Sequence, residues 1–269
     1  MSQYGKDIRL RRILRSGRGT LVVAFDHPLV LGTIHGTRDP VRQISQFIQG
    51  EADAVLLNLG NFRLVPEAAS AALPGLIARL DWTTALGTAT GNPIAGFRSG
   101  LVGTPEDAMR AGADAVIVFL VIGSGDTEFE KNEIERVAAV ARQCERIGMP
   151  LIVESVARGQ SLENPRDPQW LMLHSRMAAE LGADVIKTEY SGDWTTMREV
   201  VTACPVPILV LGGSRSGSDE DILAITRDIM RSGAAGVFFG RNVFQAADMP
   251  QLMRRLHAVL RAEAEPQRR

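Results

Sequence analysis

The chain has 269 residues, a length that suits one large domain or two ordinary ones and excludes a short disulfide-stapled module. Hydrophobic residues make up 45% and charged residues 23%, so the composition is that of a globular protein rather than a disordered or fibrous one. The formal net charge of −1, without a basic block, predicts no nucleic-acid partner, and no apolar run has the length of a membrane span. The charged N-terminus and the two isolated cysteines lead us to expect a reduced, cytoplasmic protein.

Short apolar runs of strand length recur along the chain, with helical patterns between them. Eight such runs predict strands, at residues 21–25, 54–59, 83–89, 115–122, 151–156, 185–190, 208–211 and 237–239. A capping residue followed by proline marks three helix starts, at Asp39, Thr104 and Asp167. No linker divides these units, so we expect a single domain over residues 1–269, in which residues 262–269 form a polar tail.

A weak internal repeat occurs where a helix passes into a strand. It reads Glu-Ala-Asp-Ala-Val at 51–55, Gly-Ala-Asp-Ala-Val at 112–116, Gly-Ala-Asp-Val-Ile at 182–186 and Gly-Ala-Ala-Gly-Val at 233–237. These copies precede every second expected strand, a period that suits a barrel in which alternate strands fill the same interior layer. We therefore predict an α/β fold, a (β/α)8 TIM barrel with an N-terminal capping helix over residues 7–14. An open doubly wound sheet is the alternative, but its Gly-x-Gly-x-x-Gly turn is missing after the first strand.

Lys187 is the first candidate for chemistry, because the chain has only three lysines against 27 arginines and this one interrupts an apolar strand. A lysine amine can attack a carbonyl and form a Schiff base, which an arginine cannot do, and burial favours the neutral amine that this step needs. The alternative is a structural lysine paired with Glu154 or Glu189.

Carboxylates end two other expected strands. Asp26, followed by His27, ends the first strand, where it could orient Lys187, hold a substrate hydroxyl or carry a proton, or simply cap the following turn. Glu154 lies in the fifth strand, next to that of Lys187, and could shuttle protons and stabilise an iminium ion. A plain salt bridge from Glu154 to Arg158 is the alternative.

Glycine-rich loops follow the last two expected strands, and in a barrel these loops form the usual phosphate site. The predicted substrate- and phosphate-binding residues are His27, at the end of the first strand, and Gly212, Gly213, Ser214, Gly240 and Arg241 in these loops. The four histidines show no spacing typical of paired metal ligands, so no metal site is predicted.

These segments together resemble the class I aldolases of the DeoC/LacD group. The resemblance rests on Ala24-Phe-Asp-His27, on Ala183-Asp-Val-Ile-Lys-Thr-Glu-Tyr-Ser-Gly-Asp193, on Leu211-Gly-Gly-Ser214 and on Gly240-Arg-Asn-Val-Phe244. The most similar members are archaeal-type fructose-bisphosphate aldolases, aminodideoxyheptulosonate synthases and the thiolase acting on phosphorylated autoinducer-2. The resemblance implies a metal-free lyase without a cofactor, with Lys187 forming the imine, Asp26 as its polar partner and a phosphorylated substrate held by the glycine loops. It also implies a homo-oligomer, in rings of five or stacked rings of ten.

One position departs from that pattern. Where the sugar-phosphate aldolases usually end the fifth strand in Tyr-Pro-Arg-Gly, this chain reads Val156-Ala-Arg-Gly159. The phenol that moves a proton in those enzymes is missing, which weighs against fructose bisphosphate as the substrate and makes Glu154 the candidate for proton transfer. A thiolase-like acyl transfer on a phosphorylated diketone and a barrel that binds a phosphorylated ligand without turnover are the alternative functions.

Overall fold

The computed structural model describes residues 2–68, 72–87, 96–160, 162–215 and 217–263. Within them, eight parallel strands pair into a closed barrel. These strands are β1 (Thr20–Phe25), β2 (Ala54–Asn58), β3 (Gly75–Arg79), β6 (Ala115–Ile122), β7 (Leu151–Ala157), β8 (Val185–Thr188), β9 (Ile208–Leu211) and β10 (Gly236–Phe239). Their order around the barrel is β1-β10-β9-β8-β7-β6-β3-β2, so β1 closes the ring against β10. The predicted (β/α)8 barrel is therefore confirmed.

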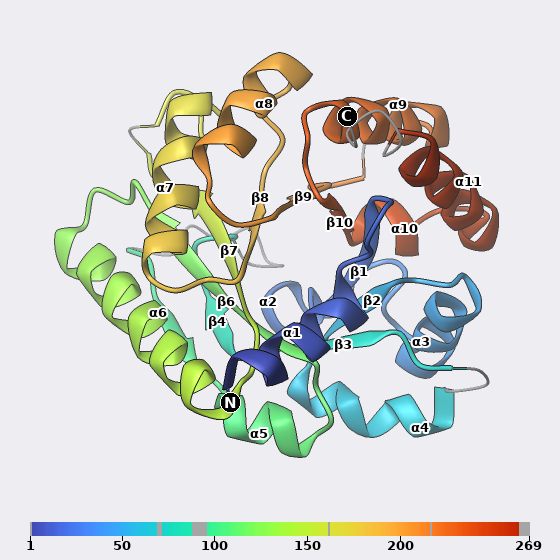
Figure 1. Cartoon of the computed structure of the whole chain (residues 1–269), viewed down its shortest axis with the longest axis horizontal. Helices are drawn as coiled ribbons and strands as arrows, with labels where there is room; N and C mark the ends of the chain where they lie inside the picture. The colour runs from blue at the N-terminus through green and yellow to red at the C-terminus, as the bar shows by residue number, and fades with distance from the viewer. Residues whose placement is uncertain (1, 69–71, 88–95, 161, 216, 264–269) are drawn as a thin grey trace.

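Helices surround the strands on the outside of the barrel, as Figure 1 shows. The longer ones are α3 (Pro40–Gln49), α6 (Thr127–Ile147), α7 (Pro168–Glu180), α8 (Trp194–Ala203), α9 (Asp219–Arg231) and α11 (Met249–Ala262). Shorter ones are α2 (Pro28–Leu31), the 3₁₀ turn η1 (Leu59–Leu64), α4 (Val65–Ala68), α5 (Pro105–Arg110) and α10 (Arg241–Phe244). The capping side chains of Asp39, Thr104 and Asp167 accept hydrogen bonds from the first turns of α3, α5 and α7, as the sequence predicts. The polar tail begins where α11 ends, and residues 264–269 lie outside the described residues.

The third strand differs from the prediction. The barrel uses β3, whereas the predicted strand over residues 83–89 is wrong: Thr83 ends the short strand β4 (Asp81–Thr83), which pairs antiparallel with β5 (Ser99–Leu101) outside the barrel. Residues 88 and 89 lie outside the described residues. The apolar core of β3 is short and ends in Arg79, so its pattern is weak. Arg79 is nevertheless 2% exposed, because carboxylates surround its guanidinium inside the barrel.

The internal repeat has a structural explanation at the amino-terminal end of the barrel. In three copies the aspartate carboxylate accepts a hydrogen bond from the backbone N–H near the start of a neighbouring strand. The pairs are Asp53 with Leu21 (2.9 Å), Asp114 with Leu76 (2.9 Å) and Asp184 with Leu151 (2.8 Å). Each aspartate precedes one barrel strand and bonds the neighbouring one, so the three join β2 to β1, β6 to β3 and β8 to β7. Each also satisfies a backbone N–H group at the rim of the barrel.

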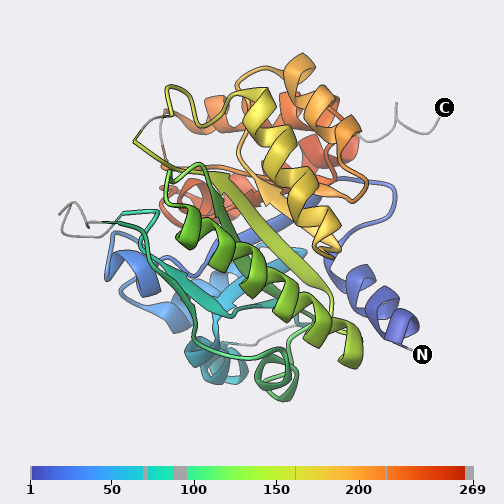
Figure 2. The same ribbon diagram turned by 90° about the vertical axis from the view of Figure 1, so that its left-hand side faces the viewer.

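The N-terminal helix α1 (Ser2–Ile13) lies across this end of the barrel, as comparison of Figure 1 with Figure 2 shows. The same aspartates hold it: Lys6 Nζ lies 3.1 Å from Asp184, Arg12 Nε 3.1 Å from Asp114, and Arg15, just after the helix, has its Nε 2.8 Å from Asp53. Ile13 is fully buried against the inner side chains of the strands. The predicted capping helix is therefore present, but it runs over Ser2–Ile13 rather than residues 7–14.

The barrel interior is a packed core, not a pore. Its inward-facing apolar residues are Val22, Ala24, Ala54, Leu56, Ile77, Ala115, Ile117, Ile152, Val185, Leu209 and Phe238. A second, larger apolar layer lies between the strands and the surrounding helices, so the strands are buried on both faces. None of the described helices has the length and apolar character needed to cross a membrane.

Candidate active site

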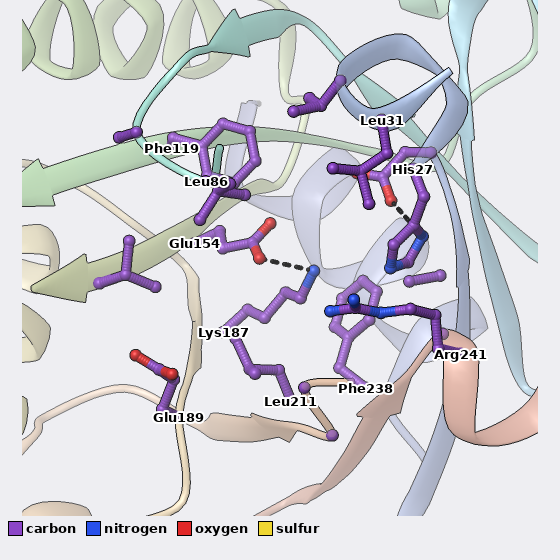
Figure 3. A pocket seen from close by; sticks show the side chains of 18 of the residues that line it. His27, Leu31, Leu86, Phe119, Glu154, Lys187, Glu189, Leu211, Phe238 and Arg241 are labelled. Carbon is purple, nitrogen blue, oxygen red and sulfur yellow. Dashed lines mark ion pairs between the residues drawn. The ribbon is translucent and has the colours of Figure 1, made fainter. Parts of the chain in front are cut away.

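A pocket opens at the carboxyl ends of the barrel strands, the end opposite α1, and Figure 3 shows it from close by. Its charged and polar lining side chains are Asp26, His27, Glu154, Arg158, Lys187, Glu189 and Arg241. Side chains from several barrel strands and the loops after them therefore converge here, and all the predicted site residues except Ser214 line the pocket. Ser214 follows the loop glycines but is exposed.

Lys187 lies near the centre of the pocket on β8. Its side chain is 6% exposed, and its Nζ lies 2.9 Å from Oε1 of Glu154, the residue directly across in β7. The ammonium also sits 4.6 Å from the ring centroid of Phe238. Lys6 and Lys131 are elsewhere, at the amino-terminal end and on the surface of α6. All three lysines of the chain are described, and Lys187 is the one that lines this pocket.

Arg79 connects the two predicted carboxylates, a role that the sequence pattern does not predict. Its guanidinium contacts Glu154 through Oε2 and lies 2.9 Å from Oδ2 of Asp26. The guanidinium carbon stands 3.8 Å above the ring of Phe119, and a third carboxylate, Asp81, lies 3.4 Å away. Asp26, Arg79, Glu154 and Lys187 therefore form one continuous chain of alternating charges within the barrel. A charged residue at the end of a buried run is the signal that could have revealed Arg79.

This alternation of charges determines the protonation of the carboxylates. Burial by itself would raise the pKa of Asp26, but the positive charges of Arg79 and Lys187 outweigh burial and lower the pKa to about 2. Burial likewise opposes ionisation of Glu154, yet Lys187 and Arg79 lower its pKa below the ordinary value. Both groups are therefore carboxylates at neutral pH.

The Asp26–His27 segment is held by its surroundings. Asn58 at the end of β2 donates a hydrogen bond from Nδ2 to the backbone carbonyl of Asp26 (2.9 Å). His27 Nδ1 lies 3.5 Å from Oδ1 of Asp26, and burial lowers the pKa of the imidazole, so it is neutral at pH 7. The ring lies against Gly240, where a Cβ atom would collide with His27 Cε1. Glycine at 240 is therefore required by the position of His27.

The two glycine loops predicted to bind phosphate lie side by side, after β9 and β10. Gly212, Gly213, Gly240 and Arg241 line the pocket, and Gly213 has a φ of +66°, which favours glycine. Arg241 points into the pocket (Figure 3), and its buried Nε has no hydrogen-bond partner among the described residues. Burial also lowers the pKa of this guanidinium. A half-buried cation without a counter-ion is suited to an anionic ligand.

The salt bridges of the pocket differ in part from those considered on sequence grounds. Arg158 does not pair with Glu154; its NH1 lies 2.7 Å from Glu189. Lys187 does pair with Glu154, which is the contact expected of both a structural and a catalytic lysine. Val156, at the position where the resemblance leads us to expect a tyrosine, is 1% exposed and lines the pocket. Within the described part of the chain, no group of three or more His, Cys, Asp or Glu side chains is placed to hold a metal ion.

Comparison with known proteins identifies the family. Residues 20–246 match the model of the DeoC/LacD family aldolases. The chain is 37% identical to the 2-amino-3,7-dideoxy-D-threo-hept-6-ulosonate synthase of Halobacterium salinarum, over 99% of this chain and 96% of the relative. It is 30% identical to the class 1 fructose-bisphosphate aldolase of Thermoproteus tenax, over 92% and 91%. An archaeal fructose-1,6-bisphosphate aldolase, solved with its catalytic Lys covalently bound to the carbinolamine intermediate, superposes with a TM-score of 0.82 at 27% identity, covering 94% of this chain and 98% of its own. The resemblance seen in the sequence is thus confirmed, and this chain belongs to the DeoC/LacD family of aldolases.

Proposed function

We propose that Lys187 is the amine through which this class I aldolase forms a Schiff base with a phosphorylated ketone or ketose. The observation that supports this most strongly is the position of Lys187, a buried lysine in a pocket at the carboxyl ends of the strands, with Glu154 2.9 Å from its Nζ. Active sites of (β/α)8 barrels lie at this end. A solved relative carries its intermediate on a catalytic lysine.

Glu154 is the proton carrier of the proposed reaction. It first accepts a proton from the Lys187 ammonium, which frees the amine to attack the ketone carbon and form a carbinolamine. Glu154 then returns this proton to the carbinolamine hydroxyl, which leaves as water and gives the iminium ion. The carboxylate next removes a proton from the carbon beside the iminium, producing an enamine whose carbon attacks an aldehyde. Hydrolysis of the new iminium releases the product and regenerates Lys187.

Arg79 and Asp26 keep their charges throughout. Arg79 holds the second oxygen of Glu154, so that the carboxylate stays directed at Lys187, and it fixes Asp26 from the other side. Asp26, with its pKa of about 2, remains an acceptor for a substrate hydroxyl at neutral pH. Arg241 and the backbone of the two glycine loops bind the phosphate of the ketone. The pocket therefore has two parts: a phosphate-binding part at Arg241 and the glycine loops, and a reacting part at Lys187 and Glu154.

Borohydride trapping tests this proposal. Dihydroxyacetone phosphate with sodium borohydride should add one reduced ketone per chain, and peptide mass mapping should find the adduct on Lys187. Lys187→Ala should lose both trapping and turnover while it stays folded by circular dichroism. Lys187→Arg keeps the charge without the nucleophilic amine, so it should be equally inactive. An adduct on another residue, or turnover by either variant, would refute the assignment.

The cellular setting and assembly are further expectations that follow from the family. We propose a cytoplasmic homo-oligomer, in a ring of five or a pair of such rings. Sedimentation equilibrium of the purified protein measures the assembly directly, and a monomer at micromolar concentration would contradict it.

A further inference from the structure

The pocket has an apolar side that the proposed mechanism leaves unused. Ala85, Leu86, Phe119 and Val156 line it, and we call them the apolar wall. They belong to one apolar cluster; Ala85, Phe119 and Val156 are buried and Leu86 packs against them. Phe119 and Val156 come from β6 and β7, and the other two residues follow β4. Every side chain in the apolar wall is pure hydrocarbon.

The apolar wall and the glycine loops lie on different sides of Lys187. In the closed strand order, β8 with Lys187 lies between β9 and β10, which the glycine loops follow, and β7 and β6, which carry Val156 and Phe119. Figure 3 agrees: Leu86 and Phe119 lie on the side of Glu154, whereas Arg241 approaches Lys187 from the opposite side. A ketone anchored by its phosphate near Arg241 and joined to Lys187 therefore directs its reacting carbon toward Glu154 and the apolar wall.

The surroundings of the apolar wall offer few partners for a hydroxyl group. One face of Phe119 is occupied by the Arg79 guanidinium, whose nitrogens already contact Asp26, Asp81 and Glu154. Val156 itself has no polar atom on its side chain. The polar side chains nearest to the apolar wall are already paired, Glu154 with Lys187 and Arg158 with Glu189, so a substrate hydroxyl placed here would lose its water and meet no free partner, whereas an alkyl group would gain dispersion contacts.

From this arrangement, and on the basis of the proposed function, we propose that the aldehyde partner carries an alkyl or aryl substituent without hydroxyl groups. The enamine carbon of the phosphorylated ketone forms a carbon–carbon bond with the aldehyde carbon, and the aldehyde oxygen takes the proton that Glu154 removed from the ketone. No oxidant or further reactant is needed. The product is a phosphorylated ketone with a β-hydroxyl next to an apolar tail, and cleavage is the reverse of this reaction.

The test compares two aldehydes of equal length, propanal and D-glyceraldehyde, with dihydroxyacetone phosphate as the ketone. Consumption of the ketone gives kcat/KM for each aldehyde. We expect propanal to be preferred by about tenfold or more, the order of discrimination that an apolar site achieves against an added polar group. Borohydride trapping with the ketone alone is run in parallel, since it reports the Schiff base independently of the aldehyde.

Propanal and D-glyceraldehyde also differ in intrinsic reactivity. Comparing the ratio of their kcat/KM values between wild type and variants of the apolar wall cancels this difference. Val156→Thr adds one hydroxyl with little change of shape, and it should lower the propanal-to-glyceraldehyde ratio by roughly tenfold. Leu86→Asn, at a partly exposed position, should shift the ratio in the same direction and carries the test if Val156→Thr does not fold. Val118→Thr is the matched control, because Val118 is equally buried on β6 but packs outside the barrel interior. It should leave the ratio unchanged.

The outcomes separate this inference from the proposed function. An adduct on Lys187 together with a preference for glyceraldehyde that neither wall variant alters would overturn the inference and leave the Schiff-base mechanism standing. Failure to trap any adduct would overturn the proposed function, and with it the inference that rests on it.

Discussion

Replacing Glu154 by glutamine tests the proposed proton carrier, which acts both in Schiff-base formation and in the steps that follow it. The side chain keeps its size and an oxygen that can accept from Arg79, but it can no longer carry a proton. Both oxygens of Glu154 are engaged in the wild type, one with Arg79 and the other 2.9 Å from Lys187 Nζ. The variant should therefore bind the ketone in the same place and be impaired in the steps that need a base.

The expected size of the effect follows from the burial of this carboxylate. Losing a general acid–base group lowers the rate by about 10²–10⁴, which corresponds to a barrier higher by about 3–5 kcal/mol. The glutamine also leaves Lys187 and Arg79 with one anion fewer in a site where Glu154 is 7% exposed. Breaking a buried ion pair lowers the free energy of unfolding by about 3–5 kcal/mol. Because glutamine keeps an oxygen that can accept from Arg79, we expect the Glu154→Gln variant to lose stability near the lower end of this range.

The assay measures kcat and borohydride trapping on the same preparation. Glu154→Gln should lose turnover by the stated factor but still accumulate the reduced adduct on Lys187 during a long incubation. Glu133→Gln is the matched control: Glu133 is buried and paired with Arg136, but it does not line the pocket, so its loss should cost stability without removing the base. Normal turnover by a folded Glu154→Gln variant would refute the role of Glu154 as proton carrier.

Four further outcomes are expected. Because the pKa of Asp26 is lowered to about 2 in the folded state, its charge stabilises the protein above pH 4 by about 2 kcal/mol. Urea unfolding should therefore show Asp26→Asn less stable than wild type at pH 7, by a difference that shrinks as the pH falls from 4 toward 2. Arg79→Met should raise the pKa of Glu154 and move the acid limb of the kcat/KM profile to higher pH, with Arg79→Lys restoring part of the shift; an unmoved profile would make Arg79 purely structural. Arg241→Gln should raise KM for dihydroxyacetone phosphate by about 10- to 100-fold, the effect of losing one charged hydrogen bond, and leave KM for hydroxyacetone unchanged. Incubation with EDTA should not change activity, and a loss that zinc restores would contradict the Schiff-base route.

The sequence is sufficient to predict the barrel and the residues that meet in its pocket because both depend on local patterns. Strands buried on two faces are continuous apolar runs, so a lysine within such a run at 187 is conspicuous. Since the active site of a barrel lies at the carboxyl ends of its strands, Asp26 and Glu154 enter the same hypothesis. The structure places these three side chains around one pocket.

The third strand and Arg79 could not be predicted in the same way. Only Leu76, Ile77 and Ala78 are apolar in β3, a run too short to stand out before the charged Arg79. Arginine at a strand end is also ordinary on a protein surface. Its burial here depends on nearby Asp81 and on Asp26 and Glu154, which are distant along the chain, and a pairing of such distant charges cannot be seen in the local pattern.

The aspartate links at the amino-terminal rim have a consequence for how this protein can be altered. They join α1 and the residues just after it to three points of the barrel, while the groups proposed for catalysis sit toward the far ends of their strands. Substitutions at Asp53, Asp114 or Asp184 should therefore affect the melting temperature far more than the chemical step, and exchanges in the loops around the pocket should do the reverse. Loops around the pocket can therefore be exchanged with little loss of thermal stability, as long as Lys6, Arg12 and Arg15 still hold the amino-terminal end of the barrel.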